Sequence, residues 1–400
     1  MMKTNALLLS GLTIMAAFHG LAQQAVPWDR EALFKTPRVF DAPEYATNGV
    51  KALFYEGVPY QGKPTRVFAY YALPKMTPGT KVPAMVLVHG GGGSAFYKWV
   101  ALWTGRGYAA ISMDTCGAIS GNGNNNHKRH AWAGPAGWGG FDKVDDPAQD
   151  QWTYHAVSAV LLGHSLLRSF PEVDADRVGI TGISWGGYLT CIAASVDNRY
   201  AFAAPVYGCG FLGDNSTWLG SFKAMGEARA KKWLGLWDPS AYLSQAKMPF
   251  LWVDGSNDFA YPMDSLQKSY RTLKTPSSLC VRLRMLHGHG GAGENPKEIY
   301  TFAEHFTRGG KPLPELTSVK REGRKVTATF SSGPCTVVRA DLNYTADKGA
   351  WKERKWEAIP VPVNACSGTV AADIPQQATV YYLNLFTEDD LAVSSEHEEL

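Results

Sequence analysis

The chain has 400 residues, of which 45% are hydrophobic and 19% are charged, so it can build a packed core and is not intrinsically disordered. Lys and Arg number 39 against 36 Asp and Glu, a formal net charge of +3. The basic residues are scattered along the chain and form no stripe. Nucleic acid is therefore excluded as an expected partner.

Residues 1–22 have the pattern of a secretory signal peptide. Lys3 precedes an apolar run over 6–18, and Gly20 and Ala22 are small residues near the expected cleavage site. The run is shorter than the roughly 20 residues that span a bilayer. We therefore expect an exported protein, periplasmic or extracellular, with no membrane insertion.

Two segments after this leader, 51–55 and 65–71, alternate like antiparallel strands. From Pro83 on, short apolar runs alternate with helical stretches, which is typical of a parallel sheet covered on both faces. The expected strands are 83–88, 109–113, 177–183, 202–206, 250–253 and 280–285, and the expected helices are 95–104, 152–167, one from Gly187, and 296–306.

Helical periodicity disappears at Pro312. Short alternating segments follow, at 325–330, 336–343, 356–361 and 379–386, and they indicate a small β-sandwich. The predicted organisation is a signal peptide over 1–22, an α/β catalytic domain over 23–311 and a β-sandwich accessory domain over 312–400.

Six cysteines are too few for a disulfide scaffold in a chain of this length. Export leaves two pairings open, Cys335 with Cys366 and Cys116 with Cys209, and buried free thiols are the alternative. The cysteines lack CxxC spacing, and no HExxH or phosphate-loop motif occurs. We therefore expect neither a metal nor an organic cofactor.

The strongest motif is Gly182-x-Ser184-x-Gly186, which lies where an expected strand gives way to an expected helix. Such a sharp turn exposes the serine hydroxyl above the sheet, and its flanking positions must be small. We predict that Ser184 is a nucleophile.

A serine nucleophile needs a base, and the base needs an acid that fixes its tautomer. Asp254 and Asp258 follow one expected strand, and His287 and His289 follow the next. We choose Asp258, because it lies further into its loop, and His289, because its Gly-His-Gly context lets an imidazole project. His287 is the alternative base, and Asp254 is expected to cap the turn.

The developing oxyanion needs backbone donors. One is expected to be the N–H of Trp185, directly after the nucleophile. The other is expected from the glycine run at 89–94, with Gly91 as first choice and Gly90 as second. His89 is expected to organise this loop.

These motifs resemble those of the α/β-hydrolase superfamily, and in particular of exported relatives of acetyl xylan esterases, dienelactone hydrolases and prolyl oligopeptidases. The resemblance covers 83–306 and is carried by 89–94, 176–187, 255–262 and 287–293. It implies the α/β-hydrolase fold and a serine hydrolase, often polysaccharide-linked in bacterial relatives. Dienelactone hydrolases carry a cysteine where this chain has Ser184. Roughly 60 residues between the leader and His89 leave no room for an oligopeptidase propeller.

A long Gly- and Asn-rich loop over 115–150 carries Trp132 and Trp138. Exposed indoles suit stacking on sugar rings, so we expect a carbohydrate-lined cleft, with Tyr207, Trp218 and Tyr261 as further wall residues. The alternative is that these tryptophans only pack the loop down.

The sequence thus predicts a secreted serine carboxylic ester hydrolase that removes acetyl or methyl ester groups from a polysaccharide. Two alternatives stay open, a serine peptidase of the prolyl oligopeptidase type and an inactive carbohydrate-binding scaffold. No oligomeric state is predicted.

Overall fold

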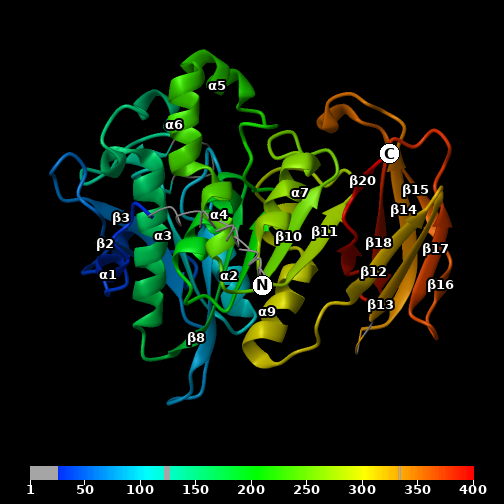
Figure 1. Cartoon of the computed structure of the whole chain (residues 1–400). Coiled ribbons are helices and arrows are strands. Elements are labelled where there is room, and N and C mark those ends of the chain that lie inside the picture. Colours follow the sequence, from blue (N-terminus) through cyan, green and yellow to red (C-terminus); the bar gives the residue numbers. More distant parts are fainter. Residues whose placement is uncertain (1–25, 121–126, 332, 334) are drawn as a thin grey trace, which may run out of the picture.

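The computed structural model describes residues 26–120, 127–331, 333 and 335–400, so the predicted signal peptide lies outside the described residues. A mostly parallel sheet forms its centre (Figure 1). The first strands pair antiparallel, and the later ones run parallel. In spatial order the strands are β1 (Val39–Asp41), β2 (Lys51–Glu56), β3 (Arg66–Ala72), β5 (Ala109–Met113), β4 (Val82–Val88), β8 (Val173–Ile183), β9 (Phe202–Val206), β10 (Phe250–Gly255) and β11 (Ser277–Arg282).

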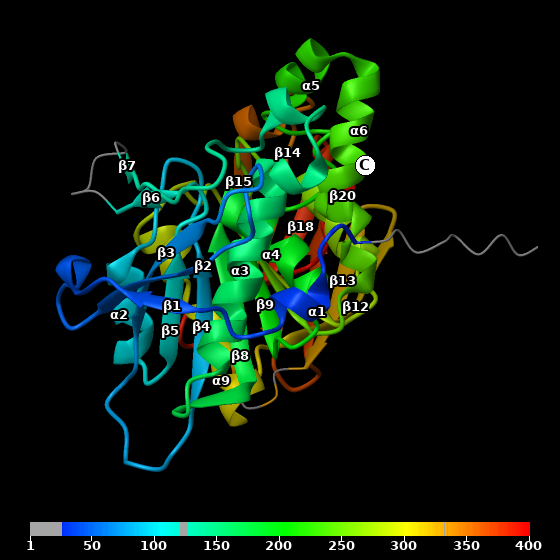
Figure 2. The same ribbon diagram turned by 90° about the vertical axis from the view of Figure 1, so that its left-hand side faces the viewer.

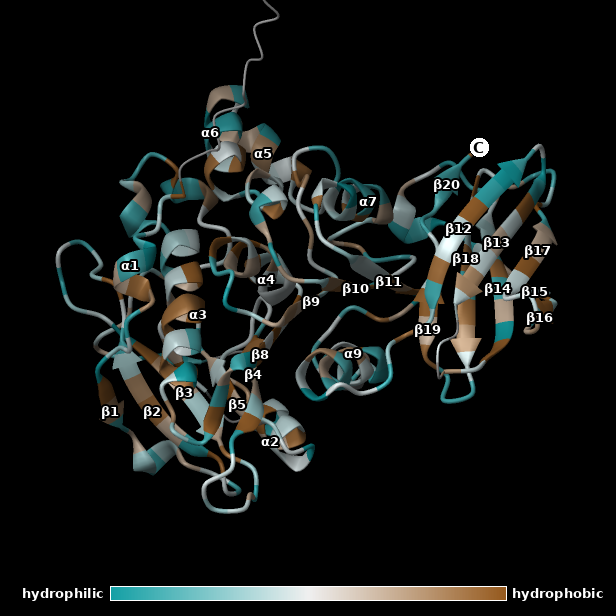
Figure 3. Cartoon of the chain, turned by 60° about the horizontal axis from the view of Figure 1, so that its bottom comes forward, coloured by the Kyte–Doolittle hydropathy of each residue, from teal (hydrophilic) through white to brown (hydrophobic). Residues whose placement is uncertain are grey.

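Helices cover both faces of this sheet. On one face lie α3 (Trp152–Arg168), α4 (Trp185–Val196) and α7 (Met263–Thr272), and on the other lie α2 (Tyr97–Gly105) and α9 (Lys297–Arg308) (Figure 2, Figure 3). The remaining helices are α1 (Arg30–Leu33), α5 (Leu219–Met225), α6 (Glu227–Trp237) and α8 (Gly291–Glu294). Over the described residues, none of the helices is long and apolar enough to cross a bilayer.

β4 shows why the central strands appear in the sequence as continuous hydrophobic segments. Val86 and Val88 belong to the core under α3 and α4, whereas Met85 and Leu87 belong to the core over α2 and α9. Successive strand side chains point to opposite faces, so a strand covered on both sides has no polar position.

The C-terminal strands form two antiparallel sheets that pack face to face. One holds β12 (Glu315–Glu322), β13 (Lys325–Ser331), β17 (Thr369–Asp373) and β16 (Val363–Asn364); the other holds β15 (Trp356–Val361), β14 (Val337–Thr345), β18 (Val380–Thr387), β19 (Ala392–Ser394) and β20 (Glu398–Glu399). Residues of both, such as Val326 and Leu383, share one core. Figure 3 shows this sandwich as a lobe beside β11, with both hydropathy colours along its strands.

The sandwich is attached to the edge of the central sheet. The Ser394 hydroxyl accepts a hydrogen bond from the Val281 N–H at 2.7 Å, and the Asn384 amide donates to the Val281 carbonyl at 3.0 Å. An exposed strand edge invites pairing with another chain. These side chains cover the edge that β11 would otherwise present.

The predicted fold class is confirmed, an α/β-hydrolase fold with additional antiparallel sheets at its C-terminus. Some strand boundaries were wrong: β8 begins at Val173, four residues before the expected start, and β11 spans Ser277–Arg282, three residues earlier at both ends than expected. Neither of the two disulfide pairings that the sequence left open is formed, because all six cysteines are free. Cys116 and Cys209 are buried, Cys335 is partly buried and Cys366 is exposed.

Candidate active site

The candidate nucleophile occupies a one-residue turn. β8 ends at Ile183 and α4 begins at Trp185, which leaves Ser184 between them with φ +57° and ψ −119°. A residue with a Cβ is strained there by about 1–3 kcal/mol. The Ser184 N–H donates to the Val206 carbonyl at 3.0 Å, which ties the turn to β9. The hydroxyl therefore lies at the N-terminus of α4, where the helix dipole favours negative charge.

The glycines around Ser184 are required by close backbone contacts. A Cβ on Gly186 would lie 2.0 Å from the Val88 carbonyl oxygen, and one on Gly182 would lie 2.2 Å from the Gly186 carbonyl oxygen. No side chain fits at those distances. The spacing in the sequence motif thus reflects the approach of α4 to β4 and β8.

Ser184, His287 and Asp258 form one hydrogen-bonded chain. The Ser184 Oγ lies 2.8 Å from His287 Nε2, and His287 Nδ1 lies 2.5 Å from Asp258 Oδ2. A hydroxyl, an imidazole and a carboxylate in this order can pass the serine proton to the ring and make the oxygen nucleophilic. The order Ser, Asp, His along the chain is the one this fold uses.

The choice of His289 as the partner of Ser184 is contradicted by these contacts. His289 Nε2 accepts a hydrogen bond from the Gly90 N–H at 2.9 Å, and its ring packs on Phe96 at 4.6 Å. The alternative, His287, takes the place between serine and carboxylate. Because β11 ends earlier than expected, the loop after it starts sooner, and His287 is the histidine that reaches back over Ser184.

The carboxylate of Asp258 is held on both oxygens. Oδ1 accepts hydrogen bonds from the N–H groups of Ala260 at 2.9 Å and Tyr261 at 2.7 Å, which leaves Oδ2 for His287. Asp254 is fully buried and accepts the N–H of Gly255. The structure therefore brings Asp258 to the histidine and keeps Asp254 at the turn.

Of the predicted oxyanion donors, Trp185 and Gly91 lie together and Gly90 is engaged elsewhere. The Trp185 N–H is at the first position of α4, where the helix supplies no acceptor. A Cβ on Gly91 would lie 2.8 Å from Trp185 Cδ1, so the two residues are adjacent. The Gly90 N–H is already bonded to His289, which corrects its assignment as a donor.

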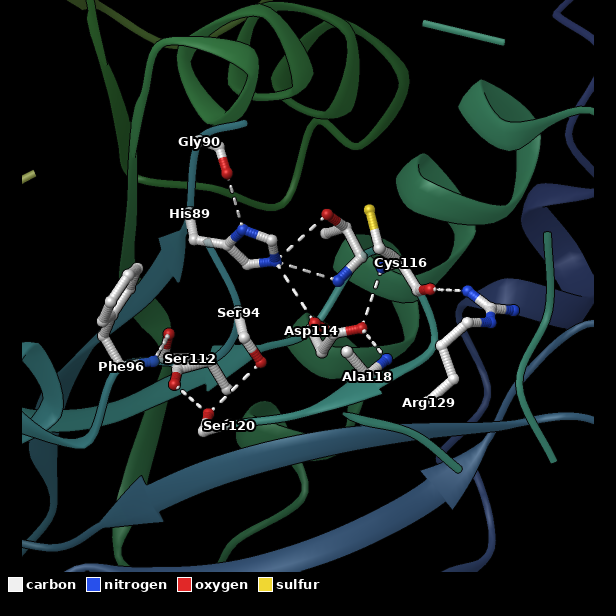
Figure 4. A network of polar contacts seen from close by, with 12 residues as sticks. His89, Gly90, Ser94, Phe96, Ser112, Asp114, Cys116, Ala118, Ser120 and Arg129 are labelled. Carbon is white, nitrogen blue, oxygen red and sulfur yellow. Dashed lines mark hydrogen bonds and ion pairs between the residues drawn. The ribbon is translucent and has the colours of Figure 1, made fainter. Parts of the chain in front are cut away.

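His89 organises the glycine loop from below (Figure 4). Its Nδ1–H donates to the Gly90 carbonyl at 2.9 Å, and its Nε2 accepts the Thr115 N–H at 3.0 Å. Asp114 then accepts the N–H groups of Cys116 and Ala118. Complete burial lowers the pKa of His89 to about 3, so the ring is neutral and keeps one donor and one acceptor nitrogen.

Two aromatic rings enclose His287: Tyr207, which the sequence offered as a possible wall residue, and Phe259, which sequence reasoning left out of the site. The Tyr207 ring stacks on it at 4.4 Å, and the Phe259 ring lies at 4.6 Å. Tyr207 Oη also donates to the Gly288 carbonyl at 2.8 Å, which holds the histidine loop. The signal for Phe259 was its position next to Asp258. Its side chain is about half exposed, at 52%, and lies beside the imidazole.

The predicted substrate-binding aromatics are only partly brought together. Trp138 packs on His89 at 5.6 Å beside the glycine loop, and Trp218 packs on Trp185 at 4.5 Å. Tyr261 is fully buried against Trp218, so it supports the wall and offers no free face.

Trp132 lies elsewhere, which corrects its assignment. Its ring packs on Arg66 at 4.0 Å and on Phe54 at 6.1 Å. Those residues belong to β3 and β2, three and four strands from β8, or about 14–19 Å at roughly 4.8 Å a strand. The part of the predicted 115–150 loop at 121–126 lies outside the described residues.

Comparisons with known proteins agree with this geometry. The acetyl xylan esterase family model matches residues 33–217, and the prolyl oligopeptidase family model matches residues 143–308. The chain is a serine esterase of the α/β-hydrolase fold. Neither match reaches the sandwich.

Solved structures of similar fold include two esterases. The acetyl xylan esterase from Paenibacillus sp. R4 is 22% identical to the chain with a TM-score of 0.54, covering 69% of this chain and 92% of its own. Acetyl xylan esterase 1 from Thermoanaerobacterium sp. JW/SL YS485 is 18% identical with a TM-score of 0.52, covering 70% and 93%. At this identity the likeness concerns the fold.

In this esterase the sandwich also contacts the loop that carries Asp258. The Asn257 side-chain amide donates to the carbonyl oxygens of Trp351, Lys352 and Arg354, at 3.3, 3.2 and 2.7 Å. Asn257 directly precedes Asp258. The sandwich therefore helps to hold in place the loop that carries Asp258.

Proposed function

We propose that the esterase releases acyl groups, acetyl first among them, from the hydroxyl oxygens of a carbohydrate through an acyl-enzyme on Ser184. The observation that carries the proposal is the hydrogen-bonded chain from Ser184 through His287 to Asp258. A serine held on a strained turn and hydrogen-bonded to an imidazole that itself contacts a carboxylate is arranged for covalent attack on a carbonyl carbon.

In the proposed mechanism, His287 Nε2 takes the proton of Ser184 while Oγ attacks the ester carbonyl. The N–H groups of Trp185 and Gly91 stabilise the oxyanion, and Asp258 orients the charged imidazole. His287 then gives its proton to the departing alcohol oxygen. Water repeats the same steps on the acyl-enzyme, releases the acid and restores Ser184.

The carbohydrate class is supported by two independent features. The acetyl xylan esterase family model covers the nucleophile turn and the glycine loop. Trp138 packs on His89 of the glycine loop, Trp218 on Trp185 and Phe259 on His287, and aromatic faces stack on the apolar faces of sugar rings. Phe259 and Trp218 retain exposure for that contact.

A peptidase is the second candidate, because the prolyl oligopeptidase family model matches the segment with all three members of the hydrogen-bonded chain. An inactive sugar-binding scaffold is the third. One set of assays separates them: p-nitrophenyl acetate, acetylated xylan, a methyl uronate ester and an aminoacyl anilide, each with wild type and Ser184→Ala.

We expect the wild type to cleave the acetyl esters faster than the anilide, and Ser184→Ala to lose this turnover. Anilide preference would favour the peptidase. Polysaccharide binding without any turnover would favour the scaffold. Preference for the methyl ester would still support an esterase, but one that removes methyl groups instead of acetyl groups.

The proposal includes export, which the leader-like pattern of residues 1–22 supports. Intact-mass analysis of the mature protein from the culture fraction tests it. We expect a chain that begins near residue 23, and a full-length chain confined to the cytoplasm would contradict export.

A further inference from the structure

His289 connects the histidine loop to the glycine loop, although it does not touch Ser184. Its Nε2 accepts the Gly90 N–H at 2.9 Å. A ring nitrogen that accepts a backbone N–H must be unprotonated, so the proton of a neutral His289 is on Nδ1. Nδ1 faces Glu294 Oε1 at 3.5 Å. Glu294 and His289 therefore form a second carboxylate–imidazole pair near that of Asp258 and His287. In this second pair the imidazole binds a backbone N–H instead of the serine hydroxyl.

The Glu294 end of this pair is itself fixed. Burial alone would raise the pKa of Glu294, but the adjacent His289 ring and the backbone at Gly290 lower it overall. The carbonyl oxygen of Glu294 accepts the indole N–H of Trp99 at 3.0 Å. The carboxylate thus keeps its charge next to His289.

Gly90 is held on both sides. His289 binds its N–H, while its carbonyl oxygen accepts the His89 Nδ1–H at 2.9 Å and the Gly93 N–H at 3.1 Å. A Cβ on Gly90 would lie 2.6 Å from the Ile183 carbonyl oxygen, so the loop is also closely packed on the nucleophile turn.

These contacts determine where Gly91 points. The Gly90 carbonyl and the Gly91 N–H belong to one planar trans peptide and point in opposite directions. With the carbonyl bound to His89, the Gly91 N–H is turned away from His89. Free rotation of the peptides on either side of Gly90 would lose this direction, and glycine resists such rotation less than any other residue.

We propose that His289 is a positioning residue of the oxyanion site, which holds the Gly90 N–H so that the Gly91 N–H stays directed at the developing oxyanion. The inference rests on the proposed function, because it assigns Gly91 as a donor in that reaction. His289 acts through the backbone and receives no proton from the serine. Its contribution should appear in the transition state more than in substrate binding.

The test compares wild type with His289→Ala, His289→Gln and His305→Ala, using p-nitrophenyl acetate. His305 is the control, since its ring also makes one hydrogen bond to the backbone, in this case to the Gly310 carbonyl at 2.9 Å, but it lies in α9. Loss of a complete oxyanion donor costs about 10²–10³ in kcat. We expect His289→Ala to lower kcat by about 10- to 100-fold with little change in KM.

The glutamine variant keeps the proposal falsifiable if the alanine variant is unstable. A glutamine side-chain oxygen can accept the Gly90 N–H, so His289→Gln should recover most of the lost kcat. The affinity of a trifluoromethyl ketone, which forms a hemiketal oxyanion on serine, should fall in His289→Ala by about the same factor as kcat/KM. His305→Ala should match wild type in both measurements.

An unchanged kcat in His289→Ala, a loss confined to KM, or a glutamine variant no better than alanine would overturn the proposal. Ser184→Ala is assayed alongside. Turnover that survives in Ser184→Ala would overturn the proposed function itself, whereas a dead Ser184→Ala with a fully active His289→Ala would overturn only the role of His289.

Discussion

At the scale of single residues, two carboxyl groups near the site have different surroundings. Complete burial, followed by the charge of Asp258, raises the pKa of Asp254 well above its ordinary value. Asp254 therefore holds its proton more tightly than an ordinary carboxyl group does. Asp258 instead accepts two backbone N–H groups and contacts His287.

This difference predicts opposite effects of two conservative variants. Asp254→Asn replaces a buried acid of raised pKa with a neutral amide of the same shape and should leave kcat within about threefold of wild type. Asp258→Asn removes the charge that stabilises the imidazolium and should lower kcat about 10³- to 10⁴-fold. Steady-state kinetics on p-nitrophenyl acetate measure both. A larger loss in Asp254→Asn would show that the wrong carboxylate has been assigned.

The sequence was sufficient to predict Ser184 and Asp258 but not to choose the histidine. A serine between a strand and a helix has one geometry, so its surroundings follow from local pattern. His287 and His289 are two residues apart in one glycine-rich loop, and the path of that loop depends on where β11 ends and on distant contacts such as Tyr207 with Gly288. Such contacts leave no local signal.

At the scale of elements, the strands were predictable where both faces are buried and less so elsewhere. β5 and β9 have buried residues throughout and coincide with the expected segments. β12 was not expected, because most of its residues are exposed and it ends in Lys320, Arg321 and Glu322. An edge strand of this kind forms because it pairs with β13, and its own composition gives little indication of a strand.

The contact of α4 with β4 predicts a strong difference between two glycine substitutions. Gly186→Ala places a Cβ 2.0 Å from a backbone carbonyl that cannot move aside, and should cost about 3 kcal/mol or more. Gly220→Ala, in α5, meets no atom within 4 Å and should be neutral or stabilising by up to about 1 kcal/mol. Denaturant unfolding compares them. Equal stabilities would contradict the close approach.

At the scale of the whole molecule, the sandwich supports the site as well as the sheet edge, through Asn257. Asn257→Ala should lower kcat about tenfold by loosening the loop that carries Asp258, since small displacements in a site are costly. Asn364→Ala is the matched control, because its side chain bonds only within the sandwich, to the Ser367 N–H. If both variants retain full kcat, the sandwich does not hold the acid.

The whole molecule should also lose stability in mild acid. Burial lowers the pKa of several histidines, to about 3 for His89 and to about 4 for His130, His155 and His397. Their unfolded pKa is near 6.5, so between about pH 6.5 and 4 the unfolded chain binds more protons than the folded one, and stability falls as pH falls. The raised pKa values of four aspartates act in the opposite direction and reduce the size of this loss; they are Asp114, Asp238, Asp254 and Asp341.

Thermal melts across this range check the sign. The Tm should fall by about 5 °C or more from pH 7 to pH 4.5. A Tm that is constant or rises on acidification would mean that these histidines are accessible to protons in the folded state.

The most direct measurement of the central claim is covalent labelling of the nucleophile. The protein is treated with a fluorophosphonate, and intact-mass and peptide analysis locate the adduct in wild type, Ser184→Ala and His287→Ala. We predict one adduct per chain on Ser184, none in Ser184→Ala, and labelling slowed at least about 100-fold in His287→Ala. An adduct on another residue, or unchanged labelling without His287, would contradict the assignment of the Ser184–His287–Asp258 chain.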